Sequence, residues 1–164
     1  MIQRIQTVYL FIIAVIAALL LLFNPSYLEI QGYDKWTGND KGNISLHFKS
    51  AEKVLNEAVI ESVNLSLMGY TLLVVSGLAF IGIFLFKNRQ LQMLLTSFNF
   101  IFILVLYVLM VFYGVKYHGL LSQEVDTEIA VGLFFPLFLP VFNYMALSRM
   151  NYDEQLLRGA NRLR

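Results

Sequence analysis

The stretch that decides the fold reads LSLMGYTLLVVSGLAFIGIFLF (residues 65–86), KNRQ (87–90) and LQMLLTSFNFIFILVLYVLMVFYGV (91–115). The two long runs contain no Asp, Glu, Lys or Arg, whereas the short segment between them carries Lys87 and Arg89. A helix rises about 1.5 Å per residue, so about 20 apolar residues cross the roughly 30 Å hydrocarbon core of a bilayer. Neither run has the polar face of a soluble core helix. The stretch therefore predicts two membrane-spanning helices joined by a tight turn.

Two further runs without charged side chains flank this pair, at residues 5–23 and 129–148. The first run is too long for the apolar region of a signal peptide and ends without a small-residue cleavage site, so we expect it to stay as an anchor. Together the four runs predict an all-α integral membrane protein. We expect one membrane domain, residues 1–164, that folds as a mostly antiparallel four-helix transmembrane bundle.

The composition agrees with a membrane protein. Hydrophobic residues make up 58% of the 164 residues and charged residues 14%, against roughly 45–50% and about 25% in soluble domains. This balance excludes an ordinary cytosolic enzyme and a disordered chain. The absence of cysteine excludes a disulfide scaffold or a cysteine-ligated metal site.

The positive charges predict the orientation in the membrane. Basic residues near the membrane collect on the cytoplasmic side, and here they gather in the 87–90 turn and in the tail at 149–164. The opposite side has nine acidic and five basic residues, which makes it acidic. We therefore expect both termini in the cytoplasm and the 24–64 loop on the outer side.

The 24–64 loop is long enough to have a structure of its own. Residues 27–33 and 44–48 predict a hairpin, since Ile44, Leu46 and Phe48 alternate with polar residues. From Ala51 onward, apolar positions recur at helical spacing and predict a short helix that runs into the second span. We expect a small hairpin-plus-helix insert here, and a simple connector in the loop at residues 116–128.

Sequence motifs for chemistry are missing. The four runs hold no ionisable side chain, which argues against a proton relay or an ion-coupled carrier. His47 and His118 lack a second ligand at metal-binding spacing. A periplasmic membrane enzyme would need these histidines and the loop acids to converge in one cleft. We expect no catalytic residue, no cofactor and no metal, and hence no enzyme.

Two asparagines and two prolines mark the third and fourth runs. Asn99 and Asn143 lie at similar depth, so we expect an interhelix polar pair that packs the helices. Pro136 and Pro140 lie four residues apart, and each removes a backbone donor, so we expect a helix kink in the fourth span. The alternative interpretation of these residues is a transport path.

Several stretches resemble a known family. The opening MIQRIQTVYL (1–10), the turn FKNRQLQ (86–92), and the closing DEQLLR (153–158) and NRLR (161–164) look like a four-span membrane family of Bacteroidetes, domain of unknown function 4293. The resemblance covers the whole chain. It implies a bacterial inner membrane with the large loop in the periplasm, and it brings no known activity. All of these stretches lie on the predicted cytoplasmic side.

These observations lead to a functional expectation. We expect a non-catalytic accessory or scaffold subunit of the inner membrane; the alternative is a small transporter or channel with a path near Asn99, Asn143 and the kinked fourth span. The expected partners are the bilayer, with anionic lipid at the cytoplasmic face, and a membrane-protein partner or a second copy, but no nucleic acid. The side chains expected to contact lipid or a partner are Arg4, Lys87, Arg89, Arg158, Arg162 and Arg164.

Overall fold

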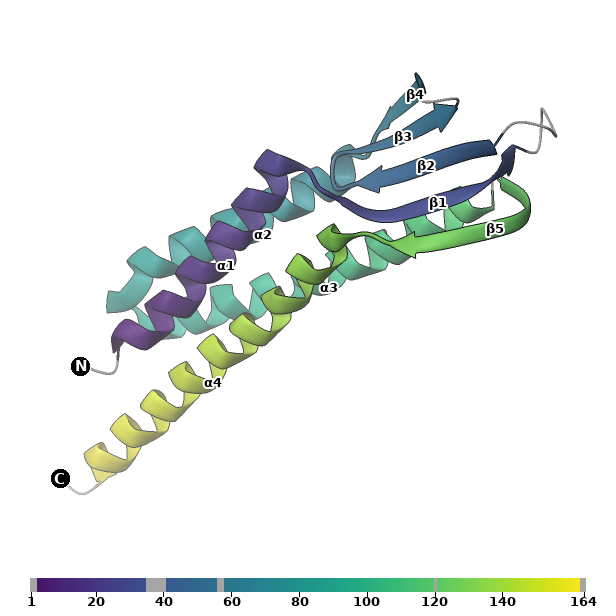
Figure 1. Cartoon of the computed structure of the whole chain (residues 1–164). Helices are drawn as coiled ribbons and strands as arrows, with labels where there is room; N and C mark the ends of the chain where they lie inside the picture. Colours follow the sequence, from purple (N-terminus) through teal and green to yellow (C-terminus); the bar gives the residue numbers. More distant parts are fainter. Residues whose placement is uncertain (1–2, 35–40, 56–57, 120, 163–164) are drawn as a thin grey trace.

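The computed structural model describes residues 3–34, 41–55, 58–119 and 121–162. The described residues form four long helices and a five-stranded sheet at one end of them (Figure 1). The helices are α1 (Gln3–Phe23), α2 (Ser66–Phe84), α3 (Arg89–His118) and α4 (Phe134–Arg162), with short 3-10 turns η1 (Leu85–Lys87) and η2 (Val131–Leu133). The strands are β1 (Ser26–Asp34), β2 (Lys41–His47), β3 (Ser50–Leu55), β4 (Ala58–Asn64) and β5 (Leu121–Ile129).

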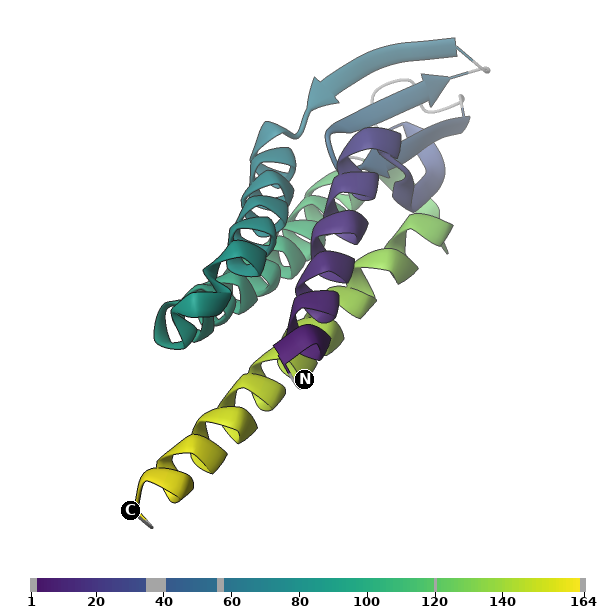
Figure 2. The same cartoon turned by 90° about the vertical axis from the view of Figure 1, so that its left-hand side faces the viewer.

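The helices form an antiparallel ring in which α1 contacts α2 and α4, and α3 contacts α2 and α4. We call the end that carries the sheet the sheet end, and the opposite end, with the α2–α3 turn, the turn end. The chain begins and ends at the turn end, and α4 runs on beyond the α2–α3 turn (Figures 1 and 2).

Four helices among the described residues are long and apolar enough to cross a membrane, and they coincide with the four predicted spans. In the most apolar 18 residues of each helix, only 28–33% of the residues are buried inside the protein. The exposed remainder includes Phe84, Val108 and Phe134, each more than half exposed. So much apolar surface needs hydrocarbon around it rather than water.

The sheet joins both loops of the sheet end. Its strand order is β4-β3-β2-β1-β5, with every neighbouring pair antiparallel. Strand β5 comes from the loop between α3 and α4, yet it pairs with β1, which directly follows α1. The face that carries Ile30, Ile44 and Leu46 is buried. Its opposite face carries the acidic side chains Glu29, Glu52, Asp126 and Glu128.

Two sequence predictions about the loops are wrong. Residues 50–55 and 58–64 form strands β3 and β4 instead of a helix, and residues 121–129 form strand β5 instead of a connector. The predicted all-α fold with a hairpin-plus-helix insert is therefore not found. The helices form a bundle, and the loops form a five-stranded antiparallel sheet outside it. The apolar positions Val54, Leu55 and Ala58 recur at helical spacing, but β3 pairs with β2 and β4 pairs with β3, since strand preference depends on neighbours.

Helix α3 supports the sheet. Its 30 residues span about 45 Å, which exceeds the roughly 30 Å of hydrocarbon that a membrane-spanning helix crosses. Leu28 of β1 lies over the last turns of α3: a Cβ on Gly114 would be 3.4 Å from its side chain. Burial, reinforced by Tyr113 and Tyr117 of α3, raises the pKa of the Tyr27 phenol. Strand β1 thus pairs with β2 and β5 in the sheet and also packs against α3.

The turn between β2 and β3 closes the sheet end of the bundle. Phe48 is fully buried there, with its ring 5.3 Å from that of Tyr27. The Tyr27 hydroxyl reaches the sulfur of Met68 in α2 at 3.9 Å. The amide of Leu65, just before α2, donates to the Lys49 carbonyl at 2.7 Å. These contacts fix the sheet to the helices.

Asn24 joins α1 to the same turn. It has a φ of 45°, and its amide donates to the Leu20 carbonyl at 3.1 Å, so it ends α1 in the left-handed conformation. Its side-chain oxygen accepts from the Lys49 amide at 2.8 Å. Its carbonyl lies 2.9 Å from the His47 ring nitrogen.

Asn24→Ala tests this junction. Alanine in the left-handed region costs about 1–2 kcal/mol, and the lost hydrogen bond costs about 1 kcal/mol more. Asn24→Gly loses only the hydrogen bonds, because glycine adopts this φ freely. Thermal unfolding in detergent, followed by circular dichroism, should give a clearly lower Tm for N24A than for N24G. Equal Tm values for the two variants would contradict the assignment of a left-handed backbone conformation to residue 24.

Gly132 lets the start of α4 approach the start of β1. A Cβ at this position would lie 2.2 Å from the Ser26 carbonyl oxygen and 3.3 Å from Pro25. Backbone atoms cannot yield cheaply, so no larger residue fits without shifting β1 or η2. The neighbouring hydrogen bond from the Ala130 amide to the Tyr27 carbonyl, 3.3 Å, depends on the same approach.

Gly132→Ala should therefore lower stability by about 1–3 kcal/mol, the usual cost of overpacking. The matched control is Gly77→Ala, because a Cβ at Gly77 meets nothing within 4 Å. The measurement is again the Tm in detergent. A G132A protein as stable as G77A would show that the close approach does not exist in the folded chain.

Candidate functional site

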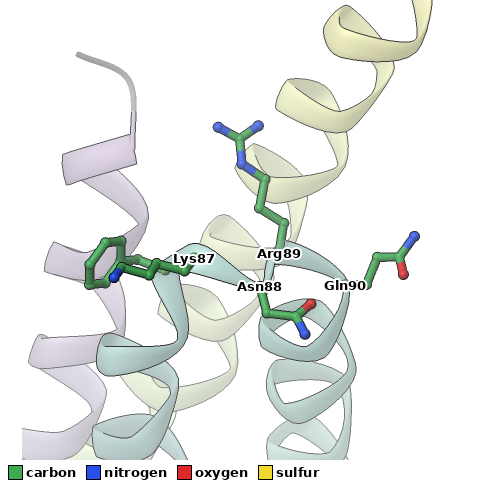
Figure 3. A pocket seen from close by; sticks show the side chains of 5 residues that line it. Lys87, Asn88, Arg89 and Gln90 are labelled. Atoms are coloured by element: carbon green, nitrogen blue, oxygen red, sulfur yellow. The ribbon is translucent and has the colours of Figure 1, made fainter.

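Of the residues predicted to contact lipid, the structure describes the side chains of Lys87 and Arg89, which lie in the basic α2–α3 turn. Chain reversal through η1 ends at Asn88, whose side chain caps α3 by accepting from the Leu91 amide at 3.4 Å. A shallow hollow of about 670 Å³ lies here, lined by residues 86–90. Lys87 and Gln90 extend to opposite sides of the turn, and Arg89 points away from the helix ends (Figure 3). The two cations are thus spread over the surface rather than focused on one point.

The other predicted contact residues lie at the same end of the bundle. Arg4 belongs to the first turns of α1, and Arg158 and Arg162 belong to the last turns of α4. The side chains of these three residues lie outside the described part of the chain, as does Arg164 altogether. The backbone therefore gathers basic positions from α1, the α2–α3 turn and α4 at the turn end.

Buried polar side chains occupy the turn half of the bundle. The Gln6 amide donates to the carboxylate of Asp153, which ties α1 to α4. The Gln92 amide donates to the Gly82 carbonyl at 2.9 Å, which ties α3 to α2. Each of these polar residues is at most 7% exposed. Every helix of the ring is thus joined to a neighbour by at least one polar contact at this end.

Asn99 and Asn143 are both buried, at 1% and 0% exposure, but they do not hydrogen-bond to each other. Asn143 instead donates to the Thr96 carbonyl of α3 at 3.1 Å. Both polar atoms of Asn99 and the side-chain oxygen of Asn143 have no partner among the described residues. The interhelix polar pair stays a prediction; Asn143 links α4 to α3 through the Thr96 carbonyl.

The prolines of α4 differ in position. Pro136 lies in the first turn, where a backbone N–H has no helical partner in any case, and Pro140 lies inside the helix. Pro140 cannot donate to the carbonyl of Pro136, four residues earlier. The Tyr107 hydroxyl of α3 donates to that carbonyl at 2.8 Å. The predicted kink stays a prediction, but the backbone acceptor that Pro140 frees is satisfied by α3.

The two histidines lie on different elements at the sheet end. His47 contacts the Asn24 carbonyl, and His118 lines a cavity of about 260 Å³ together with Leu28, Gly114 and Thr127. Across the described ranges, no three His, Cys, Asp or Glu side chains come close enough to hold a metal ion.

The comparison with known families adds an assignment. The model of a family described as "Domain of unknown function (DUF4293)" matches residues 2–163. The chain belongs to the DUF4293 family. None of the curated proteins matches the chain. The DUF4293 match covers both loops and all four spans, so the sheet belongs to the family domain and is not an addition to it.

The sequence of this DUF4293 chain did not predict several of its buried polar contacts. Tyr107, Gln92 and Thr96 lie in an apolar run, where a polar residue carries no sign of its partner. Gln6 and Asp153 are 147 positions apart, so no local pattern connects them. One signal was available: Gln92, Thr96 and Asn99 recur at intervals of four and three residues, which places them on one helix face.

Tyr107→Phe tests the α3–α4 contact. The variant keeps the ring and removes the donor to the Pro136 carbonyl, so we expect a loss of about 1 kcal/mol, typical of hydrogen bonds between membrane helices. Tyr144→Phe is the control, because Tyr144 is 68% exposed on α4. Unfolding in detergent should show a lower Tm for Y107F than for Y144F. The reverse order would contradict the assigned role.

Proposed function

We propose that this DUF4293 protein is a non-catalytic accessory or scaffold subunit of the inner membrane of Bacteroidetes. The observation that carries the proposal is the sheet. Both loops of the sheet end contribute strands to it, and Asn24, Phe48 and Gly132 fix it to the helices. A rigid polar surface at a fixed height above a membrane suits the docking of another protein.

The acidic face of the sheet is the proposed partner surface. The register places Glu29 between Glu128 on β5 and Ser45 on β2, and Glu52 lies beyond Ser45 on β3. Glu29 and Glu128 are directly opposite each other, an arrangement that is unfavourable in an isolated sheet. A basic partner surface would relieve this repulsion. Charge complementarity of this kind favours rapid and selective association.

The basic turn end supports an orientation and a lipid contact. Under the positive-inside rule, Lys87, Arg89 and the tail arginines favour a topology with both termini in the cytoplasm and the sheet in the periplasm. Each basic residue near an anionic leaflet contributes about 1 kcal/mol of attraction. We propose that Arg4, Lys87, Arg89, Arg158, Arg162 and Arg164 hold anionic lipid at the inner leaflet.

A small transporter is the second candidate. The unpaired amide of Asn99 is the observation in its favour. Toward the sheet end, however, the neighbouring interior positions are the fully buried apolar side chains of Ile103, Leu106 and Leu139. A path through the bundle would have to pass between them without polar lining, so the scaffold is the better supported proposal.

Purification in mild detergent followed by mass spectrometry tests the scaffold. We expect a companion protein with the wild-type chain and at least a fivefold loss of it with the sheet variant E29Q/E52Q/E128Q. The turn variant K87Q/R89Q should keep the companion. A wild-type chain that purifies alone, or equal recovery with both variants, would contradict the proposal.

The same preparations test the lipid contact. We expect K87Q/R89Q to retain less phosphatidylglycerol than the wild type. The control K49Q/K116Q removes the same charge from exposed lysines at the sheet end and should retain the wild-type amount. Equal loss with both pairs would mean that lipid retention follows net charge and not the turn end.

A further inference from the structure

The buried amides at the centre of the bundle carry an inference that does not depend on the proposed scaffold role. Asn99 is 1% exposed, and neither its donor nor its acceptor atom has a partner in the described part of the chain. Asn143 is fully buried and uses its donor but not its acceptor. In hydrocarbon an unsatisfied amide is costly, since no lipid group replaces its hydrogen bonds.

The two amides lie near each other between α3 and α4. Asn143 donates to the Thr96 carbonyl, and Asn99 follows Thr96 by three residues, on the same face of α3 and one turn farther in. Asn99 lies ten residues after Arg89, where α3 begins, which is about 15 Å along the helix and half the thickness of the hydrocarbon core.

We infer that Asn99, Asn143 and Thr96 form a water-binding site inside the bundle, which opens toward the turn end and is closed toward the sheet end. The three unpartnered atoms are the side-chain nitrogen of Asn99, which can donate, and the side-chain oxygens of Asn99 and Asn143, which can accept. A buried water typically makes about three hydrogen bonds to such groups. The site carries no charge of its own, because α3 and α4 present no ionisable side chain at this depth.

The side chains on the two sides of the site differ in polarity. Between Asn99 and the turn end, the interior holds the polar side chains of Gln92 and Thr96 and the contact between Gln6 and Asp153, beside the apolar side chains of Ala146 and Met150. On the other side, Ile103 and Leu106 of α3 and Leu139 of α4 are fully buried and apolar. Water therefore has polar partners on the way in from the turn end, whereas beyond the site the Tyr107 hydroxyl of α3 is already bonded to the Pro136 carbonyl of α4.

Single cysteines test the site, because the chain has no cysteine of its own. The variants are Asn99→Cys and, as matched control, Ile103→Cys, one turn farther on the same helix and equally buried. A membrane-impermeant methanethiosulfonate of small size reacts with thiolate, which forms readily only where water is present. Gln90→Cys, exposed at the turn end, reports access of the reagent.

We expect the thiol of the N99C variant to react at least tenfold faster than that of I103C in proteoliposomes of known orientation, and only with reagent on the turn-end side. The N143C variant should react like N99C. Equal rates for N99C and I103C, or reaction of N99C from the sheet-end side, would overturn the inference.

A second measurement keeps the wild-type side chains at the site. Hydrogen exchange of the intact protein in nanodiscs, followed by mass spectrometry, should show faster exchange for the α3 amides around Asn99 than for those around Ile103 and Leu106. Equal protection of the two segments would overturn the inference even if the cysteine variants failed to fold.

Discussion

Every polar group of the bundle must find its partner inside the protein, because lipid offers none. This constraint explains why the helices are joined where they are. Pro140 frees the carbonyl of Pro136, and Tyr107 of the neighbouring helix binds it. Gln92 binds the Gly82 carbonyl of α2, and Asn143 binds the Thr96 carbonyl of α3. The apolar side chains of the spans hold the helices in the membrane, and these few polar contacts help to set which helices are neighbours.

The same demand shapes the loops outside the membrane. Strand β1 leaves α1 with unpaired backbone groups on both edges, and β2 and β5 satisfy them from two different loops. The sheet thus links the α1–α2 half of the chain to the α3–α4 half at one end. Polar contacts between Gln6 and Asp153 join α1 and α4 at the other end. The two ends also differ in charge, with an acidic sheet face and basic turn-end positions.

The sequence predicts what is decided locally and fails where distant segments decide. The four spans follow from composition, and the β1–β2 hairpin follows from the alternation of Ile44, Leu46 and Phe48. The helical spacing at residues 50–64 gives no sign of strands, which depend on the pairing of β3 with β2 and of β4 with β3. Strand β5 is polar and acidic, so its sequence does not predict that it pairs with β1. Within the site, the depth of Asn99 and Asn143 is predictable, but the choice of Thr96 as the acceptor depends on the rotation of both helices.

The central claim is that four helices cross the bilayer and that one sheet gathers both loops on the same side. Single cysteines at Ser45 in β2 and at Asp126 in β5, compared with one at Gln90 in the turn, test it in intact cells. An impermeant maleimide should label positions 45 and 126 from the same side of the membrane, and position 90 only after the membrane is opened. Labelling of positions 45 and 126 from opposite sides would contradict both the number of crossings and the shared sheet.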